Sequence, residues 1–308
     1  MQPVFFKPIP RPAIWGRTLL RDYFTYDEFP LGIGQSWAFS AQEGGSTVVR
    51  EGEYAGLSLL DLWQNHPRLF CSKHTRFPVI ISLVAPEDDL SIQIHPDSEY
   101  ARPLGYPSGK NEAWYFIEAE RDASIVYGHN ARDEVDLRGY IKRGDWEGLI
   151  RHRPVSAGDF VYLPAGLLHA LKKGSIVYEI QQATDVTYRF YDYRRTDEQG
   201  NERELHLEEA IACMRYGSVA ENNEPQPVHG IESGLDVTTF IQNESFCVRR
   251  YRCNGEGCLC ATGYMLVTVV KGSGTAGGKT VRRGDSFLLP AGCKTAIIGG
   301  MELMVTCE

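Results

Sequence analysis

A short stretch with polar side chains in a strand-like pattern, residues 90–114, most constrains how this chain can fold. Apolar and polar residues alternate from Leu90 to His95, which is the pattern of a half-buried strand. Because successive side chains of a strand point to opposite faces, Gln93 and His95 share one face. Glu112 follows seventeen residues after His95, within the sequence GKNEAWY. If that segment forms a neighbouring strand, the three side chains can converge on one metal ion.

A second constraint is an internal repeat. The sequence GDFVYLPAG at residues 158–166 recurs as GDSFLLPAG at residues 284–292. Two copies of one supersecondary unit predict two related β-domains. The first copy is followed by His169, whereas Thr295 occupies the equivalent position after the second copy. We therefore expect only the first domain to bind metal.

The first copy and its histidine follow the spacing G-x5-P-x-G-x2-H, which resembles the second motif of the cupin superfamily. Cupins fold as double-sheet jelly rolls, and the resemblance implies one metal ion inside the barrel. The candidate ligands are the polar side chains that this arrangement brings together, namely Gln93, His95, Glu112 and His169. Imidazole, carboxylate and amide oxygen together suit Zn²⁺ or a similar divalent ion of the first transition row.

The expected fold is mainly β, with two cupin (jelly-roll) barrels and a few added helices. A length of 308 residues suits two domains. A polar stretch with prolines places their boundary near residue 230: residues 1–230 would form a catalytic, metal-binding cupin domain with helical insertions, and residues 231–308 a degenerate cupin domain. Apolar spacing predicts helices at residues 58–66, 133–149 and 205–216. Strands are expected within residues 31–40, 77–94, 114–127 and 160–163.

Composition excludes several classes of partner. The formal net charge is −8 and no basic run occurs, so we expect no nucleic-acid partner, because phosphate-backbone binding needs clustered Lys and Arg. The sequence has no run of about 18 apolar residues, the length of a membrane span, and no signal peptide at its start. A cytoplasmic protein without a membrane partner is expected. A small anionic ligand needs only a few local basic groups, and the sequence assigns no oligomeric partner.

Four blocks resemble a known family, the type I mannose-6-phosphate isomerases in their short bacterial form. They are LSIQIHPD at residues 90–97, GKNEAWY at 109–115, PAGLLHA at 164–170 and EIQQATDVTYRFYDY at 179–193. The resemblance implies two cupin domains, one zinc ion bound by the four candidate ligands, and interconversion of mannose 6-phosphate and fructose 6-phosphate. By the same match, four residues fall on active-site positions of the family: Lys110, Glu179, Asp185 and Arg189.

The implied chemistry accounts for these residue types. Aldose–ketose isomerisation moves a proton between C1 and C2 through an enediol, so negative charge develops on the carbonyl oxygen. A cation beside that oxygen stabilises it, and an acid–base group must carry the proton. We expect Arg189 to act as electrophile or phosphate contact, and Lys110 to contact substrate. A carboxylate of Glu179 or Asp185 would carry the proton. Alternatively, Arg189 is structural and stacks on the neighbouring aromatic rings.

Two residues depart from the family pattern. Gln35 stands where family members usually carry glutamate, and Ser82 stands where a lysine is expected. A hydroxyl in place of an ammonium removes a charge that could meet a phosphate. These departures motivate a second hypothesis, a catalytically impaired double cupin that binds a sugar phosphate as a regulatory module. A third hypothesis, a cupin enzyme of other chemistry such as an iron dioxygenase, is disfavoured because the matching blocks extend far beyond the metal ligands.

Overall fold

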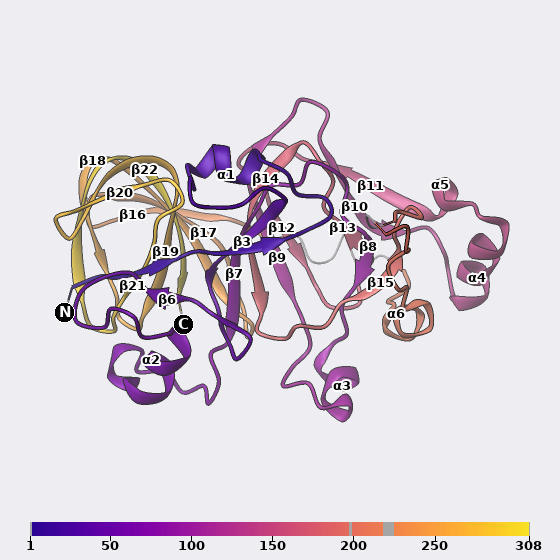
Figure 1. The fold of residues 1–308 in the computed structure, drawn as a ribbon, viewed down its shortest axis with the longest axis horizontal. Coiled ribbons are helices and arrows are strands. Elements are labelled where there is room, and N and C mark those ends of the chain that lie inside the picture. The colour runs from indigo at the N-terminus through magenta and orange to yellow at the C-terminus, as the bar shows by residue number, and fades with distance from the viewer. Residues whose placement is uncertain (1, 197–198, 218–224, 308) are drawn as a thin grey trace.

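The protein is mainly β, built from open antiparallel sheets with short helices around them. The structure, a computed structural model, describes residues 2–196, 199–217 and 225–307. Figure 1 shows the strands of the C-terminal segment gathered at one end of an elongated molecule and helices α4 to α6 at the other. Within the described residues, no helix is long and apolar enough to cross a membrane. The expected cytoplasmic location stays a prediction.

Two sheets face each other in the N-terminal part of the chain. The larger, in spatial order, consists of β12 (Phe160–Leu163), β9 (Glu112–Ala119), β14 (Ser175–Gln182), β7 (Val79–Val84), β3 (Ile33–Phe39) and β2 (Ile9–Pro12). The smaller consists of β11 (Ile150–Pro154), β10 (Ser124–His129), β13 (His169–Ala170), β8 (Ile92–Ile94) and β15 (Tyr188–Tyr191). We call them the central sheet and the outer sheet.

A third sheet contains the C-terminal strands together with two from the N-terminal part. Its strands are β16 (Val228–Glu232), β17 (Leu235–Gln242), β18 (Cys247–Cys260), β22 (Lys294–Cys307), β19 (Met265–Ala276), β21 (Ser286–Leu289), β1 (Val4–Lys7) and β6 (Val48–Val49), with β20 (Lys279–Arg282) paired to β19. A small hairpin joins β4 (Ala41–Gln42) to β5 (Gly45–Ser46). Because β1 pairs with β21, the first strand of the chain belongs to the C-terminal sheet.

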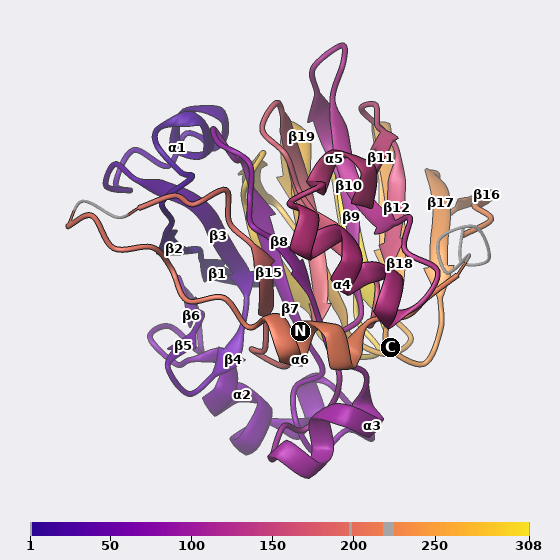
Figure 2. The ribbon, with the colours of Figure 1, turned by 90° about the vertical axis from the view of Figure 1, so that its right-hand side faces the viewer.

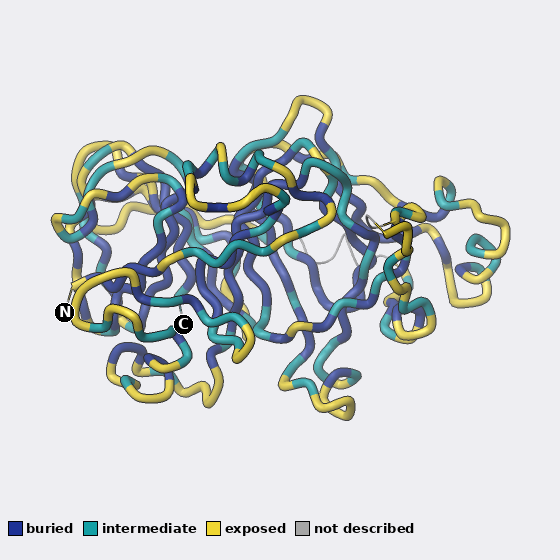
Figure 3. The backbone as a smooth tube through the Cα atoms, viewed as in Figure 1, coloured by how far each residue is buried: buried dark blue, intermediate teal, exposed yellow. Residues whose placement is uncertain are grey.

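Short helices surround the sheets. They are α1 (Leu19–Phe24), α2 (Leu59–Asn65), α3 (Ser98–Ala101), α4 (Glu134–Arg143), α5 (Trp146–Leu149) and α6 (Leu207–Cys213), with 3₁₀ turns η1 (Pro67–Leu69) and η2 (Arg102–Leu104). The three predicted helical segments are confirmed by α2, the α4–α5 pair and α6. Ser58 caps α2 through a reciprocal capping box with Asp61. Figure 2 shows helices outside the sheets, and Figure 3 shows that the outlying segments are more exposed than the strands between them.

The central sheet is buried on both faces, and strand β9 shows how its sequence achieves this. Trp114 and Phe116 pack toward the outer sheet. The alternate residues Ala113, Tyr115 and Ile117 pack toward the C-terminal sheet. A strand covered on both faces has apolar residues at successive positions. Glu112 belongs to the first set by period two, so the one carboxylate that opens this strand faces the outer sheet.

The internal repeat is visible as a repeated turn. Asp159 accepts a hydrogen bond from the backbone N–H of Ser156 at 2.8 Å, and Asp285 accepts one from that of Arg282 at 2.9 Å. The first and last glycines of both copies have positive φ, between 72° and 97°, a conformation that glycine adopts without strain. The two copies therefore form the same local structure.

The predicted division near residue 230 stays a prediction. Residues 218–224 of the predicted linker lie outside the described residues. Strand β16 continues through residue 230. The C-terminal sheet encloses a core of apolar side chains, and Thr295 is buried.

A buried hydrogen bond connects the central sheet to the C-terminal sheet. The hydroxyl of Tyr115 donates to Oε1 of Glu302 at 2.6 Å, and Nε of Arg252 donates to the other carboxylate oxygen at 2.7 Å. We expect Tyr115→Phe to lower the free energy of unfolding by about 1.5–3 kcal/mol, as for a hydrogen bond to a charged acceptor. Urea unfolding measures the loss.

Tyr127→Phe is the matched control. Its hydroxyl donates to the backbone oxygen of Tyr162 at 3.0 Å, a neutral acceptor, so the expected loss is only about 0.5–1.5 kcal/mol. Equal losses in the two variants would show that the hydrogen bond between the sheets contributes no more stability than an ordinary hydrogen bond to a neutral acceptor.

Candidate metal centre

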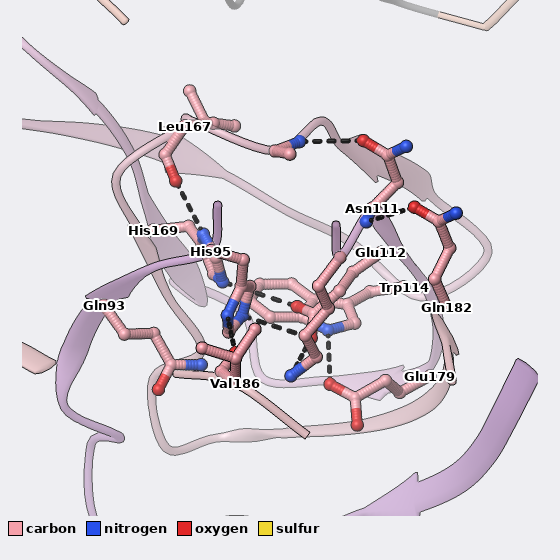
Figure 4. Close-up of polar contacts among 12 residues, drawn as sticks. Gln93, His95, Asn111, Glu112, Trp114, Leu167, His169, Glu179, Gln182 and Val186 are labelled. Atoms are coloured by element: carbon pink, nitrogen blue, oxygen red, sulfur yellow. Dashed lines mark hydrogen bonds and ion pairs between the residues drawn. The ribbon is translucent and has the colours of Figure 1, made fainter. Parts of the chain in front are cut away.

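The four candidate ligands come from two facing sheets, so Glu112 does not lie on a strand next to that of Gln93 and His95, as the sequence suggested. Gln93 lies on β8, His95 directly follows β8, and His169 opens β13, all in the outer sheet. Glu112 opens β9 in the central sheet. Gln93 and His169 are direct cross-strand partners. Figure 4 shows His95, His169 and Glu112 pointing toward one another, with Gln93 beside them.

Three of these side chains form a tight, buried cluster. One ligand atom from each of His95, Glu112 and His169 lies within 4.8 Å of the other two. Nε2 of His95 lies 3.3 Å from Oε1 of Glu112, and Nε2 of His169 lies 3.4 Å from Oε2. Each of the three residues is 1% exposed. Among the described residues, this is the one cluster of three or more such groups with metal-binding spacing.

Backbone carbonyl groups orient both imidazoles. Nδ1 of His95 lies 2.8 Å from the carbonyl oxygen of Val186, and Nδ1 of His169 lies 2.8 Å from that of Leu167. A carbonyl oxygen only accepts, so a hydrogen bond at this distance places the proton on Nδ1. The other nitrogen, Nε2, then presents its lone pair to the cluster. Metal-binding histidines typically have this outer hydrogen bond.

The charges in the cluster favour a bound cation. Burial and the Lys110 ammonium lower the pKa of His95 to about 4, so its imidazole is neutral. Burial opposes ionisation of Glu112, but Lys110, whose Nζ lies 2.8 Å from Oε1, outweighs it and holds the pKa of this carboxyl well below its usual range. A neutral imidazole nitrogen and an ionised carboxylate therefore face each other with lone pairs.

Such an arrangement fits a metal ion. Nε2 of both histidines and Oε2 of Glu112 are buried and make no hydrogen bond. Buried polar atoms almost always have partners, and unpaired ones are costly in a low-dielectric interior. A cation between these atoms would satisfy all three. Gln93 can add an amide oxygen as a fourth ligand, and that oxygen accepts a 3.4 Å hydrogen bond from Ser91.

Of the remaining predicted site residues, the structure brings three close to this cluster and leaves one outside it. Lys110 contacts Glu112 directly. Glu179 lies on β14, opposite Trp114, and Arg189 lies on β15, opposite Gln93. Asp185 is exposed. It lines a cavity of about 1080 Å³ whose lining includes none of the four candidate ligands.

Glu179 is a buried carboxyl held by two donors. Nε1 of Trp114 donates to Oε1 at 2.9 Å, and Nε2 of Gln35 donates to Oε2 at 3.0 Å. Burial and the Glu112 carboxylate raise the pKa of Glu179 to about 7, despite the opposing effect of Lys110. Glu179 can therefore exchange a proton near neutral pH.

Arg189 belongs to an arginine cluster that the sequence interpretation missed. Asp192, which is 4% exposed, accepts hydrogen bonds from Arg195 and from Arg203, the latter at 2.7 Å through both oxygens. Burial and the neighbouring Arg203 lower the pKa of Arg189. Nε of Arg189 and Nε of Arg195 are buried and make no hydrogen bond. Three arginines around one aspartate leave an excess of positive charge, which suits an anion. The run of charges in residues 192–204 was the available signal.

This geometry defines a class: a mainly β protein with a buried His–Glu–His centre that can hold a divalent metal ion, beside a carboxyl group with a shifted pKa and a group of arginines. Comparison with known proteins gives the family. Residues 7–120 match the family described as phosphomannose isomerase type I, catalytic domain.

Similarity extends over nearly the whole chain. Mannose-6-phosphate isomerase ManA of Bacillus subtilis (strain 168) is 39% identical over 298 residues, covering 94% of this chain and 94% of that protein. The mannose-6-phosphate isomerase of Streptococcus mutans is 38% identical, covering 99% of this chain and 98% of that protein. The chain belongs to the type I phosphomannose isomerase family.

Solved structures agree. The crystal structure of mannose 6-phosphate isomerase from Bacillus subtilis is 38% identical, covers both chains completely and superimposes with a TM-score of 0.94. A variant of phosphomannose isomerase from Salmonella typhimurium is only 12% identical but has a TM-score of 0.77 over the full length of both chains. That second likeness shows a shared fold alone.

We expect His95→Ala and His169→Ala each to abolish tight metal binding, because each removes an oriented nitrogen ligand. The measurement is metal content by mass spectrometry after loading with zinc and desalting. His129→Ala is the control, because His129 is also buried on the outer sheet but bonds to the carbonyl oxygen of Arg215 and lies outside the cluster. Retention of one zinc ion per chain by both ligand variants would refute the site.

Proposed function

We propose that this protein interconverts mannose 6-phosphate and fructose 6-phosphate through an enediol, with one zinc ion held by Gln93, His95, Glu112 and His169. The relatives over nearly the whole chain bear the name mannose-6-phosphate isomerase. The observation that carries the proposal is the set of unpaired, buried ligand atoms of two histidines and a glutamate. Nitrogen and oxygen ligands with a single carboxylate suit Zn²⁺.

A bound zinc ion would supply electrostatic stabilisation to the oxygen on which negative charge develops. The protein's own groups do the rest. Glu179 accepts the proton from one substrate carbon and returns it to the next, a role that requires a pKa near the working pH. Of the two carboxylates considered from the sequence, Glu179 is favoured over Asp185 because it is buried beside the candidate ligands, whereas Asp185 is exposed.

The arginine cluster binds the phosphate group. Arg189 and Arg195 both present an unpaired buried Nε, and guanidinium groups match phosphate geometry. Arg189 lies opposite Gln93 on the adjacent strand, so an anchored phosphate would leave the sugar to extend toward the metal centre. Lys110, already buried against Glu112, contacts the substrate at that end.

The proposal includes the double-cupin arrangement. The central and outer sheets enclose the candidate site between them, as the two sheets of a jelly roll do. The repeated turn at residues 158–166 and 284–292 supports a second, related unit in the C-terminal sheet. With residues 1–230 as the metal-binding unit, the C-terminal unit has Thr295 in place of a ligand and an apolar core, in keeping with a structural role.

A coupled assay tests the activity. Zinc-loaded protein is expected to convert mannose 6-phosphate into fructose 6-phosphate, with activity lost on chelation and restored by zinc. Measurable binding of mannose 6-phosphate without turnover would reject the isomerase and favour the regulatory module. Bound iron with oxygen-dependent activity would favour the third hypothesis.

The pKa of Glu179 predicts the pH dependence of the reaction. Because the pKa is raised to about 7, Glu179 is protonated, and unable to accept a proton, below that pH. Zinc on Glu112 would offset the charge of that carboxylate, but burial, the larger cause, still raises the pKa of Glu179. We therefore expect kcat/KM to fall at a higher pH than the pH of about 5 to which a carboxylate of ordinary pKa would keep its activity. The profile is measured on the zinc-loaded enzyme from pH 5 to 9.

Substitution of the carboxyl group checks the assignment. Glu179→Gln is expected to lower kcat about 10²- to 10⁴-fold and to remove the inflection near neutral pH. Glu118→Gln, on β9 and paired with Lys271 at the surface, is the matched control and should behave like the wild type. A normal profile in the Glu179 variant would remove this residue from the proton transfer.

A further inference from the structure

The two residues that depart from the family pattern, Gln35 and Ser82, lie in contact with each other and with Glu179. Nε2 of Gln35 donates to Oγ of Ser82 at 3.0 Å and to Oε2 of Glu179 at 3.0 Å. They are far apart in sequence and lie on different strands, β3 and β7. Sequence reading treated them as separate losses of charge, but the structure joins them in one hydrogen-bonded group.

Strand register explains how the group forms. Ser82 lies directly opposite Glu179 on one side and Trp37 on the other. Gln35 precedes Trp37 by two positions, so its side chain is on the same face. Gln35 and Ser82 are therefore diagonal neighbours, about 7–8 Å apart and within reach of a long side chain. Glu179 lies one strand further on, opposite Ser82. The amide of Gln35 therefore extends across the short Ser82 side chain to reach the carboxyl group.

We propose that Gln35 is a positioning residue for Glu179, holding its carboxyl group in place for proton transfer, and that the small Ser82 side chain makes this contact possible. The proposal rests on the function proposed above. Glu179 has one fixed donor on each oxygen, the indole of Trp114 and the amide of Gln35. The indole N–H holds only Oε1. Loss of the Gln35 amide would therefore leave Oε2 without a donor.

The same geometry limits which residues could stand together at positions 35 and 82. A glutamate at position 35 would place a second carboxylate about 3 Å from Glu179, and two carboxylates at that distance do not both ionise freely. A lysine at position 82 would supply the compensating charge. Gln35 with Ser82 is electrically neutral, as a glutamate with a lysine would be. Gln35 with Ser82 thus has the same net charge as that pair would have, and it supplies a donor to Glu179.

The test combines kinetics with a spectroscopic measurement on the zinc-loaded protein. In Gln35→Ala, kcat for mannose 6-phosphate is expected to fall about 10- to 100-fold, the effect of one lost hydrogen bond to a charged group, with KM changed less than about threefold. Gln35→Glu should lower kcat further. The double variant Gln35→Glu, Ser82→Lys should have a kcat at least tenfold higher than that of Gln35→Glu alone. Ser36→Ala is the control: Ser36 is a buried residue on the same strand, on the opposite face.

The indole N–H resonance of Trp114, assigned with Trp114→Phe, provides a readout that needs no turnover. Trp114 donates to the carboxyl group that Gln35 holds, so this resonance should move in Gln35→Ala and stay unchanged in Ser36→Ala. A Gln35→Ala variant with kcat within twofold of the wild type and an unshifted Trp114 resonance would overturn the positioning role. If the wild type converts no sugar phosphate, the proposed function fails, and the Trp114 resonance alone decides the role of Gln35.

Discussion

Two imidazole nitrogens and a carboxylate oxygen that meet in a buried space, without hydrogen bonds among them, set the main constraint on this structure. Nδ1 of His95 and Nδ1 of His169 each hydrogen-bond to a backbone carbonyl group. These bonds orient Nε2 of each ring toward Glu112. Burial makes this arrangement unfavourable unless positive charge neutralises it. Lys110 provides one positive charge at Oε1, and a metal ion would satisfy the remaining ligand atoms. Backbone carbonyl groups thus orient the two imidazoles in a way that suits a bound cation.

The fold delivers these atoms by stacking three layers. The central sheet packs one face against the C-terminal sheet and directs the other toward the outer sheet, so a single period-two strand supplies both core and site. Asn111, just before Glu112, shows how tightly the layers are joined. Its side chain accepts from the backbone of Ala165 at 2.8 Å and donates to Ser245 at 3.0 Å. The C-terminal segment therefore supports the strand that carries Glu112, the candidate carboxylate ligand.

Sequence alone predicted the helices and most strands, and it singled out His95, Glu112 and His169, which the structure brings together, because each of these depends on local spacing. The alternation from Leu90 to His95 and the turn before His169 can each be recognised from a few consecutive residues. Sheet membership could not be predicted in this way. Glu112 lies across from the two histidines on a facing sheet, because strand order is set by packing at long range.

The environment of Glu179 could not be predicted either, for the same reason. Gln35 and Trp114 reach it from β3 and β9, strands that no local pattern places beside β14. The arginine cluster around Asp192 escaped notice because charged residues in a loop usually lie in solvent. What sequence identified as departures at Gln35 and Ser82 acquired a physical meaning only when register placed them together.

Anomalous X-ray scattering at the zinc edge, from crystals grown with zinc, tests the central claim most directly. The account predicts one strong peak at bonding distance from Nε2 of His95, Nε2 of His169 and a carboxylate oxygen of Glu112, about 2.0–2.2 Å from each. A fully loaded crystal with no peak between these three residues, or with its zinc elsewhere in the protein, would contradict it.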